Sequence, residues 1–307
     1  MSKPVPRIVP TTPALARART IHVGGILVLP LLTTVLALVL ALNGLFEAWY
    51  LLVFFVMWLI SGIGITVGYH RLLTHRAFSA TPTARAVLAI MGGIAQQGPP
   101  IYWVALHRRH HELADAQGDP HSPFTHDLDD EGPWTGFLHS HLRWMFVHDV
   151  PNTLVYAPDL IRDKAIARVN RAYGPIVLAS VLLPGLIGLL FQPDPLGFAM
   201  GVLWGAGVRL FVQQHAIWSI NSACHMFGRR AFQTDDHSTN LAWLALPTLG
   251  ESWHNNHHAV PNSAAFSTAW HQLDPGWYVV RLLGLLKQAS GFERGVARLR
   301  QKASQHP

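Results

Sequence analysis

Four stretches of the chain are rich in apolar residues and almost free of charge. A helix rises about 1.5 Å per residue, so roughly 20 apolar residues cross about 30 Å of hydrocarbon. The sequence therefore predicts an all-α integral membrane protein with four transmembrane helices. Their approximate bounds are 24–43, 48–68, 175–191 and 196–217, and only Arg209 places a charge within them.

The spans form two hairpins with short connections, near residues 43–47 and 192–195. Neither connection contains a lysine or an arginine, whereas four basic residues precede the first span: Lys3, Arg7, Arg17 and Arg19. Cytoplasmic segments carry an excess of such residues. We expect a multi-pass protein of the cell membrane with both termini in the cytoplasm. The remaining segments, about 70–172 and 218–307, are predicted to form a cytoplasmic helical cap.

The whole chain, residues 1–307, is interpreted as a single membrane domain whose first 20 residues are mobile at the tip. Only 13% of the residues are charged, which is low for a soluble protein. The net charge of +6 could indicate nucleic-acid binding, but the basic residues follow the membrane topology, so we expect no nucleic-acid partner. The single cysteine, Cys224, excludes a disulfide framework and a cysteine-ligated cluster within the chain.

Histidines recur at a spacing that suits a helix face. His107, His110 and His111 are related by three and four positions, and His254, His257 and His258 repeat this spacing. Another pair, His70 and His75, follows the second span directly, and residues five apart need a bend or a helix end to reach one site. Burying so many rings is costly unless they are satisfied, for example by coordination.

These histidines all lie in the segments predicted to be cytoplasmic, with His70 and His75 directly after the second span, so they can converge beneath the membrane. Their number exceeds what one ion takes, and the absence of thiolates argues against a structural zinc of the cysteine type. Imidazole suits iron, among other metals. A methylene group in an acyl chain has no acidic hydrogen, so acid–base or nucleophilic side chains cannot attack it. An oxidising metal centre that uses O2 can.

The chain resembles the membrane fatty acyl desaturases, and most closely the bacterial members of the stearoyl-CoA (delta-9) type. The likeness extends from the first span to about Ser263. It rests on three histidine boxes, His70-x4-His75, His107-x2-His110-His111 and His254-x2-His257-His258, and on three further segments. These are Gly118-Asp119-Pro120-His121, Gly136-Phe137 through His141 with Trp144, and Asn221-Ser222-Ala223-Cys224-His225.

This resemblance implies a set of site residues. Two Fe2+ ions would be held by nine histidines, namely His70, His75, His107, His110, His111, His225, His254, His257 and His258. Asn221 would hold a metal-bound water, and Gln97, Trp103 and Ile217 would line the substrate tunnel, with Gln97 and Trp103 shaping its bend. The implied reaction uses O2 as co-substrate and places a cis double bond, at delta-9, in a saturated acyl chain.

The resemblance favours acyl-CoA as the substrate, but the relatives that use acyl-CoA in animals carry charged residues just before the second box. This chain has Ala105 and Leu106 there, so acyl lipids stay open as substrates. The chain lacks a haem-binding motif, a cysteine cluster and a dinucleotide fingerprint in the right context. We therefore expect a separate electron donor, a ferredoxin or a flavoprotein reductase.

Two other kinds of function are alternatives. A lipid hydroxylase or carotenoid ketolase would share the histidine boxes but add oxygen to the product. A metal transporter or storage protein would need polar ligands within the spans, which hold only Arg209 and the terminal His215. We expect Arg209 to face the bundle interior and to hydrogen-bond near the metal centre or substrate. His139, His141 and His148 are interpreted as surface or supporting residues.

Overall fold

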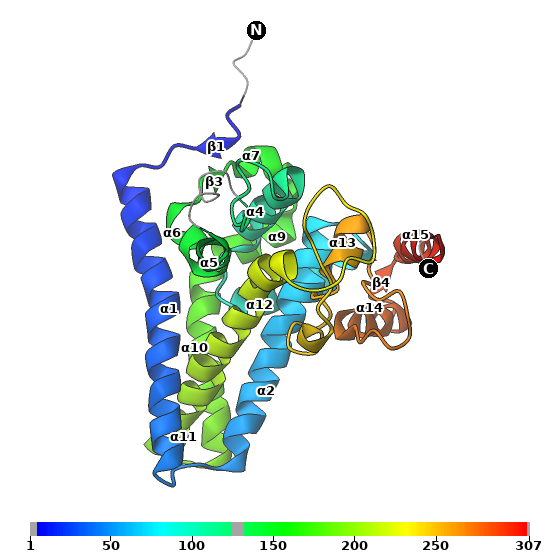
Figure 1. The fold of residues 1–307 in the computed structure, drawn as a ribbon. Helices are drawn as coiled ribbons and strands as arrows, with labels where there is room; N and C mark the ends of the chain where they lie inside the picture. The colour runs from blue at the N-terminus through cyan, green and yellow to red at the C-terminus, as the bar shows by residue number, and fades with distance from the viewer. Residues whose placement is uncertain (1–4, 125–131, 306–307) are drawn as a thin grey trace.

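The computed structural model describes residues 5–124 and 132–305, and it consists mainly of helices (Figure 1). Four long helical segments stand side by side, and shorter helices and loops lie across one end of them. The long segments are Pro13–Leu42, Ala48–Thr74, Tyr173–Phe191 and Pro195–Met226, and all are long and apolar enough to cross a membrane. The predicted all-α fold with four spans is confirmed.

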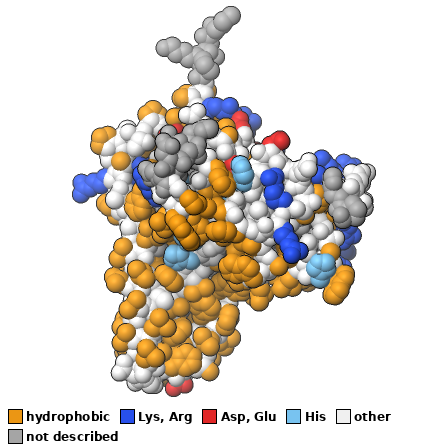
Figure 2. Space-filling model, viewed as in Figure 1, with side chains coloured by type: hydrophobic (Ala, Val, Ile, Leu, Met, Phe, Trp, Pro, Cys, Tyr) orange, Lys and Arg blue, Asp and Glu red, His pale blue; other side chains and the backbone are white. Residues whose placement is uncertain are grey.

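Hydrophobic side chains cover the long helices in Figure 2, whereas lysine and arginine gather over the opposite end of the molecule. On the first helix, Leu29, Leu32 and Leu38 each expose more than half of their surface, at 63%, 58% and 55%. Exposed apolar side chains on this scale mark a surface that contacts lipid or another apolar partner. The distribution suits helices that stand in a bilayer.

The first helix, α1 (Pro13–Leu42), begins well before the predicted start at residue 24. Thr12 caps it by accepting a hydrogen bond from Leu15 N at 3.2 Å, and Pro13 occupies the first turn, where its missing N–H costs nothing. The charges of Arg17 and Arg19 ended the apolar pattern, but they did not end the helix. The additional turns of α1 extend out of the apolar layer toward the cap.

The expectation of a mobile tip over residues 1–20 is wrong from β1 onward, and residues 1–4 lie outside the described part. The strand β1 (Ile8–Val9) pairs antiparallel with β3 (Val150–Pro151), with Ile8 opposite Pro151. Arg7 forms an ion pair with Glu112. These contacts fix the entry to α1 against the cap.

The second span is α2 (Ala48–Ile63) continued by η1 (Gly64–Thr74), a π-helix. A π-helix has i→i+5 hydrogen bonds, and here the amide of His75 donates to the carbonyl of His70 at 3.1 Å. This wider turn supplies the bend that lets His70 and His75, five residues apart, reach one site. Gly64 lets α3 (Pro82–Ile94) pack closely, because a Cβ there would lie 2.0 Å from Gly92 N.

The second hairpin pairs α10 (Tyr173–Phe191) with a helix made of α11 (Pro195–Val202), η4 (Leu203–Val208) and α12 (Arg209–Met226). Gly188 permits close packing, since a Cβ there would lie 2.2 Å from Gly197 O. Small residues at helix contacts are typical of membrane proteins. The fourth helix ends at Met226 rather than near residue 217, so Asn221 and His225 lie on its last turns.

The cap contains the remaining helices and a second two-stranded sheet, in which β2 (Ser79–Ala80) pairs antiparallel with β4 (Ala289–Ser290). Between the second and third spans lie α4 (Pro100–Leu113), α5 (Pro133–Leu138), η3 (His139–Arg143), α6 (Trp144–Val147), α7 (Thr153–Tyr156), α8 (Pro158–Arg162) and α9 (Lys164–Arg171). After the fourth span come η5 (Ala242–Leu244), α13 (His254–Ala259), α14 (Pro275–Leu285) and α15 (Glu293–Ser304).

Arg209 is fully buried within the bundle, as expected. It donates to the carbonyl of Gly205 at 3.1 Å, to that of Ile94 at 3.1 Å and to Gln213 Oε1 at 3.4 Å. Backbone carbonyls near a membrane helix can accept such bonds when a neighbouring helix ends beside it. None of these partners belongs to a histidine cluster, so these hydrogen bonds of Arg209 join the end of α3 to the fourth span and do not reach the predicted site.

Candidate metal centre

The nine predicted histidines converge on one place beneath the long helices, where they form two groups. The five-histidine cluster contains His70, His75, His107, His111 and His257, and the four-histidine cluster contains His110, His225, His254 and His258. Within each group, one ring nitrogen from every member lies within 4.8 Å of the others. The segments that supply them are η1, α4, α12 and α13, which are distant in sequence.

The helical spacing explains how three neighbouring histidines serve two clusters. On α4, His107 and His111 are one turn apart and reach the five-histidine cluster, while His110 reaches the other. On α13 the division is reversed, since His254 and His258 share the four-histidine cluster and His257 joins the five. Each short helix therefore bridges the two clusters, and a shift of either helix moves both.

The ring nitrogens face one another at distances that suit coordination of a shared ion. In the five-histidine cluster, Nε2 of His257 lies 3.1 Å from that of His70 and 3.0 Å from that of His111. In the four-histidine cluster, His225 and His254 place their Nε2 atoms 3.1 Å apart. Within the described residues, the buried Nε2 atoms of His75, His110 and His258 have no hydrogen-bond partner.

Burial keeps most of these rings in the neutral form that binds metals. Burial and the neighbouring His70 hold the pKa of His75 well below its usual range, and burial acts in the same direction on the pKa of His111. Burial lowers the pKa of His258 to about 4, although Asp236 opposes the shift. Neutral rings with inward, unpartnered nitrogens fit a pair of metal ions.

Carboxylates behind the histidines are the functional residues that the sequence reasoning missed. Nδ1 of His110 lies 2.9 Å from Asp119, that of His225 lies 2.9 Å from Asp115, and that of His258 lies 2.7 Å from Asp236. His70 pairs in the same way with Glu251. A carboxylate on Nδ1–H fixes the tautomer and orients Nε2 toward the cluster. Two of these carboxylates lie close to residues that the sequence had already indicated. Asp119 belongs to the Gly-Asp-Pro-His segment, and Glu251 lies three residues before His254.

Asn221 lies on α12, one turn before His225, and it lines a cavity beside the clusters. Its proposed role in holding a metal-bound water stays a prediction.

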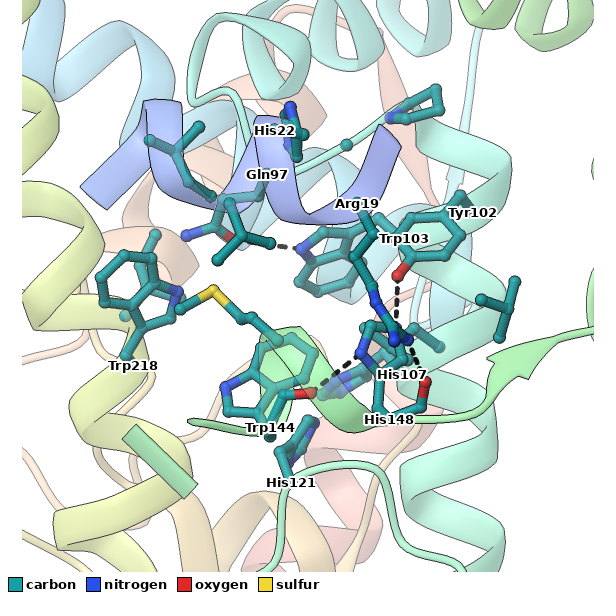
Figure 3. Close-up of a pocket in the computed structure, with 18 of the residues that line it drawn as sticks. Arg19, His22, Gln97, Tyr102, Trp103, His107, His121, Trp144, His148 and Trp218 are labelled. Atoms are coloured by element: carbon teal, nitrogen blue, oxygen red, sulfur yellow. Dashed lines mark hydrogen bonds between the residues drawn. The ribbon is translucent and has the colours of Figure 1, made fainter. Parts of the chain in front are cut away.

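The cavity has a volume of about 390 Å³ and is lined mainly by apolar side chains (Figure 3). Three predicted tunnel residues, Gln97, Trp103 and Ile217, all line it, as does His107 of the five-histidine cluster. The indole Nε1 of Trp103 donates to Gln97 Oε1 at 3.2 Å, and the indole stacks on the ring of His107 at 5.0 Å between centroids. The cavity thus adjoins the five-histidine cluster through Trp103.

One wall of the cavity comes from α1, which the sequence analysis did not connect with the site. Arg19, His22 and Val23 are among its lining residues, and Arg19 donates to the carbonyl of His148 at 2.8 Å. His148 is buried and its Nε2 lies 2.7 Å from the hydroxyl of Tyr102. His148 was expected at the surface or in a supporting position; it belongs to neither cluster, and its burial excludes the surface position.

His141 is also outside both clusters. Its ring contacts Ser222 Oγ at 2.9 Å and His215 Nδ1 at 3.0 Å. Burial, and to a lesser extent the neighbouring His215, lowers the pKa of His141 to about 4. His139, the third histidine outside the boxes, is the first residue of η3. It also belongs to neither cluster.

Comparison with known proteins identifies the class to which this arrangement belongs. Residues 47–285 match the profile of the fatty acid desaturase family. A hex-5-enoyl-[acyl-carrier protein] acetylenase of Moorena producens is 45% identical over 226 residues, which cover 73% of this chain and 70% of that protein. Delta-9 acyl-lipid desaturase 2 of Arabidopsis thaliana is 37% identical, covering 77% and 72%. The sn-1 stearoyl-lipid 9-desaturase of Anabaena variabilis is 36% identical, covering 77% and 80%. With its histidine clusters and four spans, the chain belongs to the fatty acid desaturase family.

Proposed function

We propose that the chain is an O2-dependent desaturase that introduces a cis double bond at C9 of a saturated acyl chain. The observation that carries the proposal is the contact between an apolar cavity and a buried pair of histidine clusters, made through His107 and Trp103. An acyl chain needs an apolar channel, and its unactivated methylenes need a strong oxidant beside that channel. The family relationship supports both requirements.

Two irons are the proposed cofactors, one in each cluster. The fit rests on neutral buried rings, on inward nitrogens without partners and on a donor set without thiolate. Two irons with O2 would supply an oxidant able to remove two hydrogens from adjacent methylenes, and two external electrons complete the reduction of O2 to water. The protein residues hold the ligands in place, exclude bulk water and position the acyl chain.

Trp103 and Gln97 are proposed to set the bend of the acyl chain beside the clusters. A cis product requires adjacent methylenes to be held in a bent arrangement, and a rigid indole fixed by a hydrogen bond suits this task. Trp144 and Trp218 line the same cavity, so aromatic surfaces surround the chain. Ile217 adds an apolar contact where a polar side chain would interrupt the wall.

For the acyl carrier, we propose a membrane glycerolipid. Two relatives reported above are acyl-lipid desaturases by name. Ala105 and Leu106 are buried, so these positions present no charge to the phosphates of CoA. The helix α1 supplies one wall of the cavity and, farther along, exposes leucines suited to lipid, which favours a substrate that comes from the bilayer. Acyl-CoA, favoured by the sequence resemblance, is the alternative that an assay distinguishes.

The function is tested by supplying purified protein with O2, a reduced ferredoxin and a saturated chain, either as stearoyl lipid in vesicles or as stearoyl-CoA. Mass spectrometry of the products should show the loss of two hydrogens and a double bond at C9 with the lipid substrate. A hydroxylated product would contradict desaturation. Product from stearoyl-CoA alone would contradict the proposed carrier while leaving the reaction intact. Comparing ferredoxin with a flavoprotein reductase identifies the class of the separate donor.

The proposed membrane is the cell membrane, with both termini and the metal centre on the cytoplasmic side. A phosphatase or fluorescent reporter fused after Pro307 should behave as cytoplasmic. The same reporter inserted near Asp194, in the connection between α10 and α11, should behave as external. The basic residues around the cap and their absence from the short connections are the physical reason. Reversed labelling would contradict this orientation.

Replacing Trp103 with alanine should broaden the position of the double bond and lower turnover by up to about 100-fold, the loss that a misplacement of the reacting atoms by about 1 Å can cause. The loss of the indole removes its bond to Gln97 and its stacking on His107. Product analysis gives the positional distribution, and iron content should stay near the wild-type value. Trp270→Ala is the matched control, because Trp270 is 94% exposed. A single unchanged product from Trp103→Ala would count against its role in the bend.

A further inference from the structure

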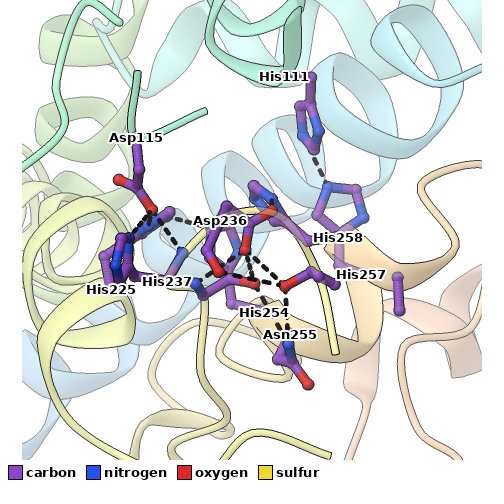
Figure 4. Close-up of polar contacts among 12 residues, drawn as sticks. His111, Asp115, His225, Asp236, His237, His254, Asn255, His257 and His258 are labelled. Carbon is purple, nitrogen blue, oxygen red and sulfur yellow. Dashed lines mark hydrogen bonds and ion pairs between the residues drawn. The ribbon is translucent and has the colours of Figure 1, made fainter. Parts of the chain in front are cut away.

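Three aspartates face the four-histidine cluster from behind, and two of these pairs are seen in Figure 4. Each places an oxygen on a histidine Nδ1, with distances of 2.9 Å for Asp115 to His225, 2.9 Å for Asp119 to His110 and 2.7 Å for Asp236 to His258. Their side chains are almost completely buried, with exposed fractions of 2%, 0% and 10%. Three of the four ligands in this cluster are therefore backed by a carboxylate.

Neutral donors hold these aspartates in position without cancelling their charge. Asp115 accepts from Ser122 Oγ at 2.6 Å and from the amide of His237 at 2.7 Å. Asp119 accepts from the amides of Asp115 and His121 at 2.9 and 3.1 Å, and Asp236 accepts from the amide of Ser238 at 2.9 Å. The ring of His237 is also 3.5 Å from Asp115, but it is 55% exposed, where solvent weakens its charge.

The five-histidine cluster has a different electrostatic environment. The carboxylate that contacts one of its histidines is that of Glu251, which pairs with His70. The same carboxylate accepts from Arg71 at 3.2 and 3.3 Å, and Arg71 also binds the buried Asp274 at 2.8 Å. One guanidinium and two carboxylates leave one net negative charge beside this cluster, against three beside the other. Arg71 is completely buried and lies 3.9 Å over the ring of Phe266, which in turn contacts His257. A second guanidinium, that of Arg108, donates to the carbonyl of Thr74 beside His75, and Asp159 pairs with it at 2.7 Å.

We infer that the two metal positions are inequivalent and that the four-histidine cluster stabilises the more oxidised iron. A carboxylate hydrogen-bonded to one ring nitrogen strengthens the other as a donor. Three buried negative charges also favour the higher charge of Fe3+, and a low dielectric strengthens this effect. Asp115, Asp119 and Asp236 are thus positioning residues that bind one iron more tightly and make it the first to lose an electron. The inference rests on the proposed function, because it needs an iron in each cluster.

The test uses the full chain loaded with 57Fe, reduced, and then treated with one equivalent of a one-electron oxidant such as a ferrocenium salt. One electron passes from one Fe2+ to the oxidant, so the Mössbauer spectrum should contain ferric and ferrous components of equal area. Asp115→Asn, Asp119→Asn and Asp236→Asn should each alter the component that is ferric in the wild type. Glu251→Gln should alter the ferrous one. Asp149→Asn, at a carboxylate that is 54% exposed and bound to Arg109, is the matched control and should alter neither.

Metal retention gives a second measurement that does not depend on activity. Loss of a carboxylate that supports a ligand typically weakens binding about 10–100-fold. A chelator should therefore remove one of the two irons from the aspartate variants at a correspondingly lower concentration, while the second iron is retained as in the wild type. Asp236→Glu keeps the charge and should restore the wild-type spectrum. It also separates an electrostatic effect from a general loss of structure, which thermal unfolding would reveal.

The inference is overturned if the aspartate variants alter the ferrous component, or if they and Glu251→Gln alter the same one. It is also overturned if Asp236→Glu behaves like Asp236→Asn. Each of these results is compatible with two bound irons and full desaturation by the wild type. By contrast, a wild-type protein that binds fewer than two irons or makes no alkene would contradict the proposed function itself.

Discussion

Replacing either His110 or His257 with alanine should abolish desaturation and lower the bound iron from about two per chain to one or none. The two residues belong to different clusters, and both are buried, with exposed fractions of 1% and 0%. Removing a ring leaves a cavity where water can enter, and it deprives an ion of a direct ligand. Loss of a supporting partner costs about 10–100-fold in metal affinity or activity, so loss of a direct ligand should exceed 100-fold.

The measurements are metal analysis of purified protein and product formation with O2 and a reduced donor. His271→Ala provides the matched control, since His271 is exposed and belongs to neither cluster. It should retain both irons and wild-type turnover. If His110→Ala kept two irons and full activity, His110 would be a structural partner of Asp119 rather than a ligand. Full activity of His257→Ala would show that the five-histidine cluster does not need a ligand from α13.

Much of this centre could be predicted from histidine spacing alone. Periodic histidines on α4 and α13 identify six of the nine residues, and the pair His70 and His75 at the end of the second span adds two more. His225 is different, because it has no histidine three or four positions away on α12 and only the resemblance to desaturases indicated it. The division into two clusters was not evident from spacing, since it depends on how α4 and α13 are oriented against η1 and α12.

The charges behind the clusters could not be predicted in the same way. Asp236 lies in a loop, and its pairing with His258 depends on a contact between segments 22 residues apart. Asp115 reaches His225 over 110 residues. Such pairs are fixed by tertiary packing, and local sequence carries no period that would reveal them. Sequence alone also placed the start of α1 too late, because its arginines interrupted the apolar pattern while the capped helix continued through them.

Arg71 is expected to be the residue whose loss most reduces stability. Arg71→Met removes a completely buried guanidinium that binds Asp274 at 2.8 Å and Glu251 at 3.2 Å, and it leaves both carboxylates without their cationic partner. Breaking a buried ion pair by removing one partner costs about 3–5 kcal/mol. Asp274 also accepts from the amide of Phe266 at 2.7 Å and caps α14 through Trp277 N at 3.0 Å, so its disturbance should spread to these segments.

Arg76→Met is the matched substitution in an exposed setting. Arg76 is 65% exposed and binds Asp159 at 2.7 Å, and pairs of this kind contribute about 0–1 kcal/mol. Unfolding of both variants, followed by tryptophan fluorescence in the same detergent, should show a large loss of stability for Arg71→Met and little change for Arg76→Met. Equal losses would mean that the buried network contributes no more than a surface pair. A loss specific to Arg71→Met would show that the buried charges hold the segment between α13 and α14 against η1. The same guanidinium binds Glu251, which precedes α13 and pairs with His70.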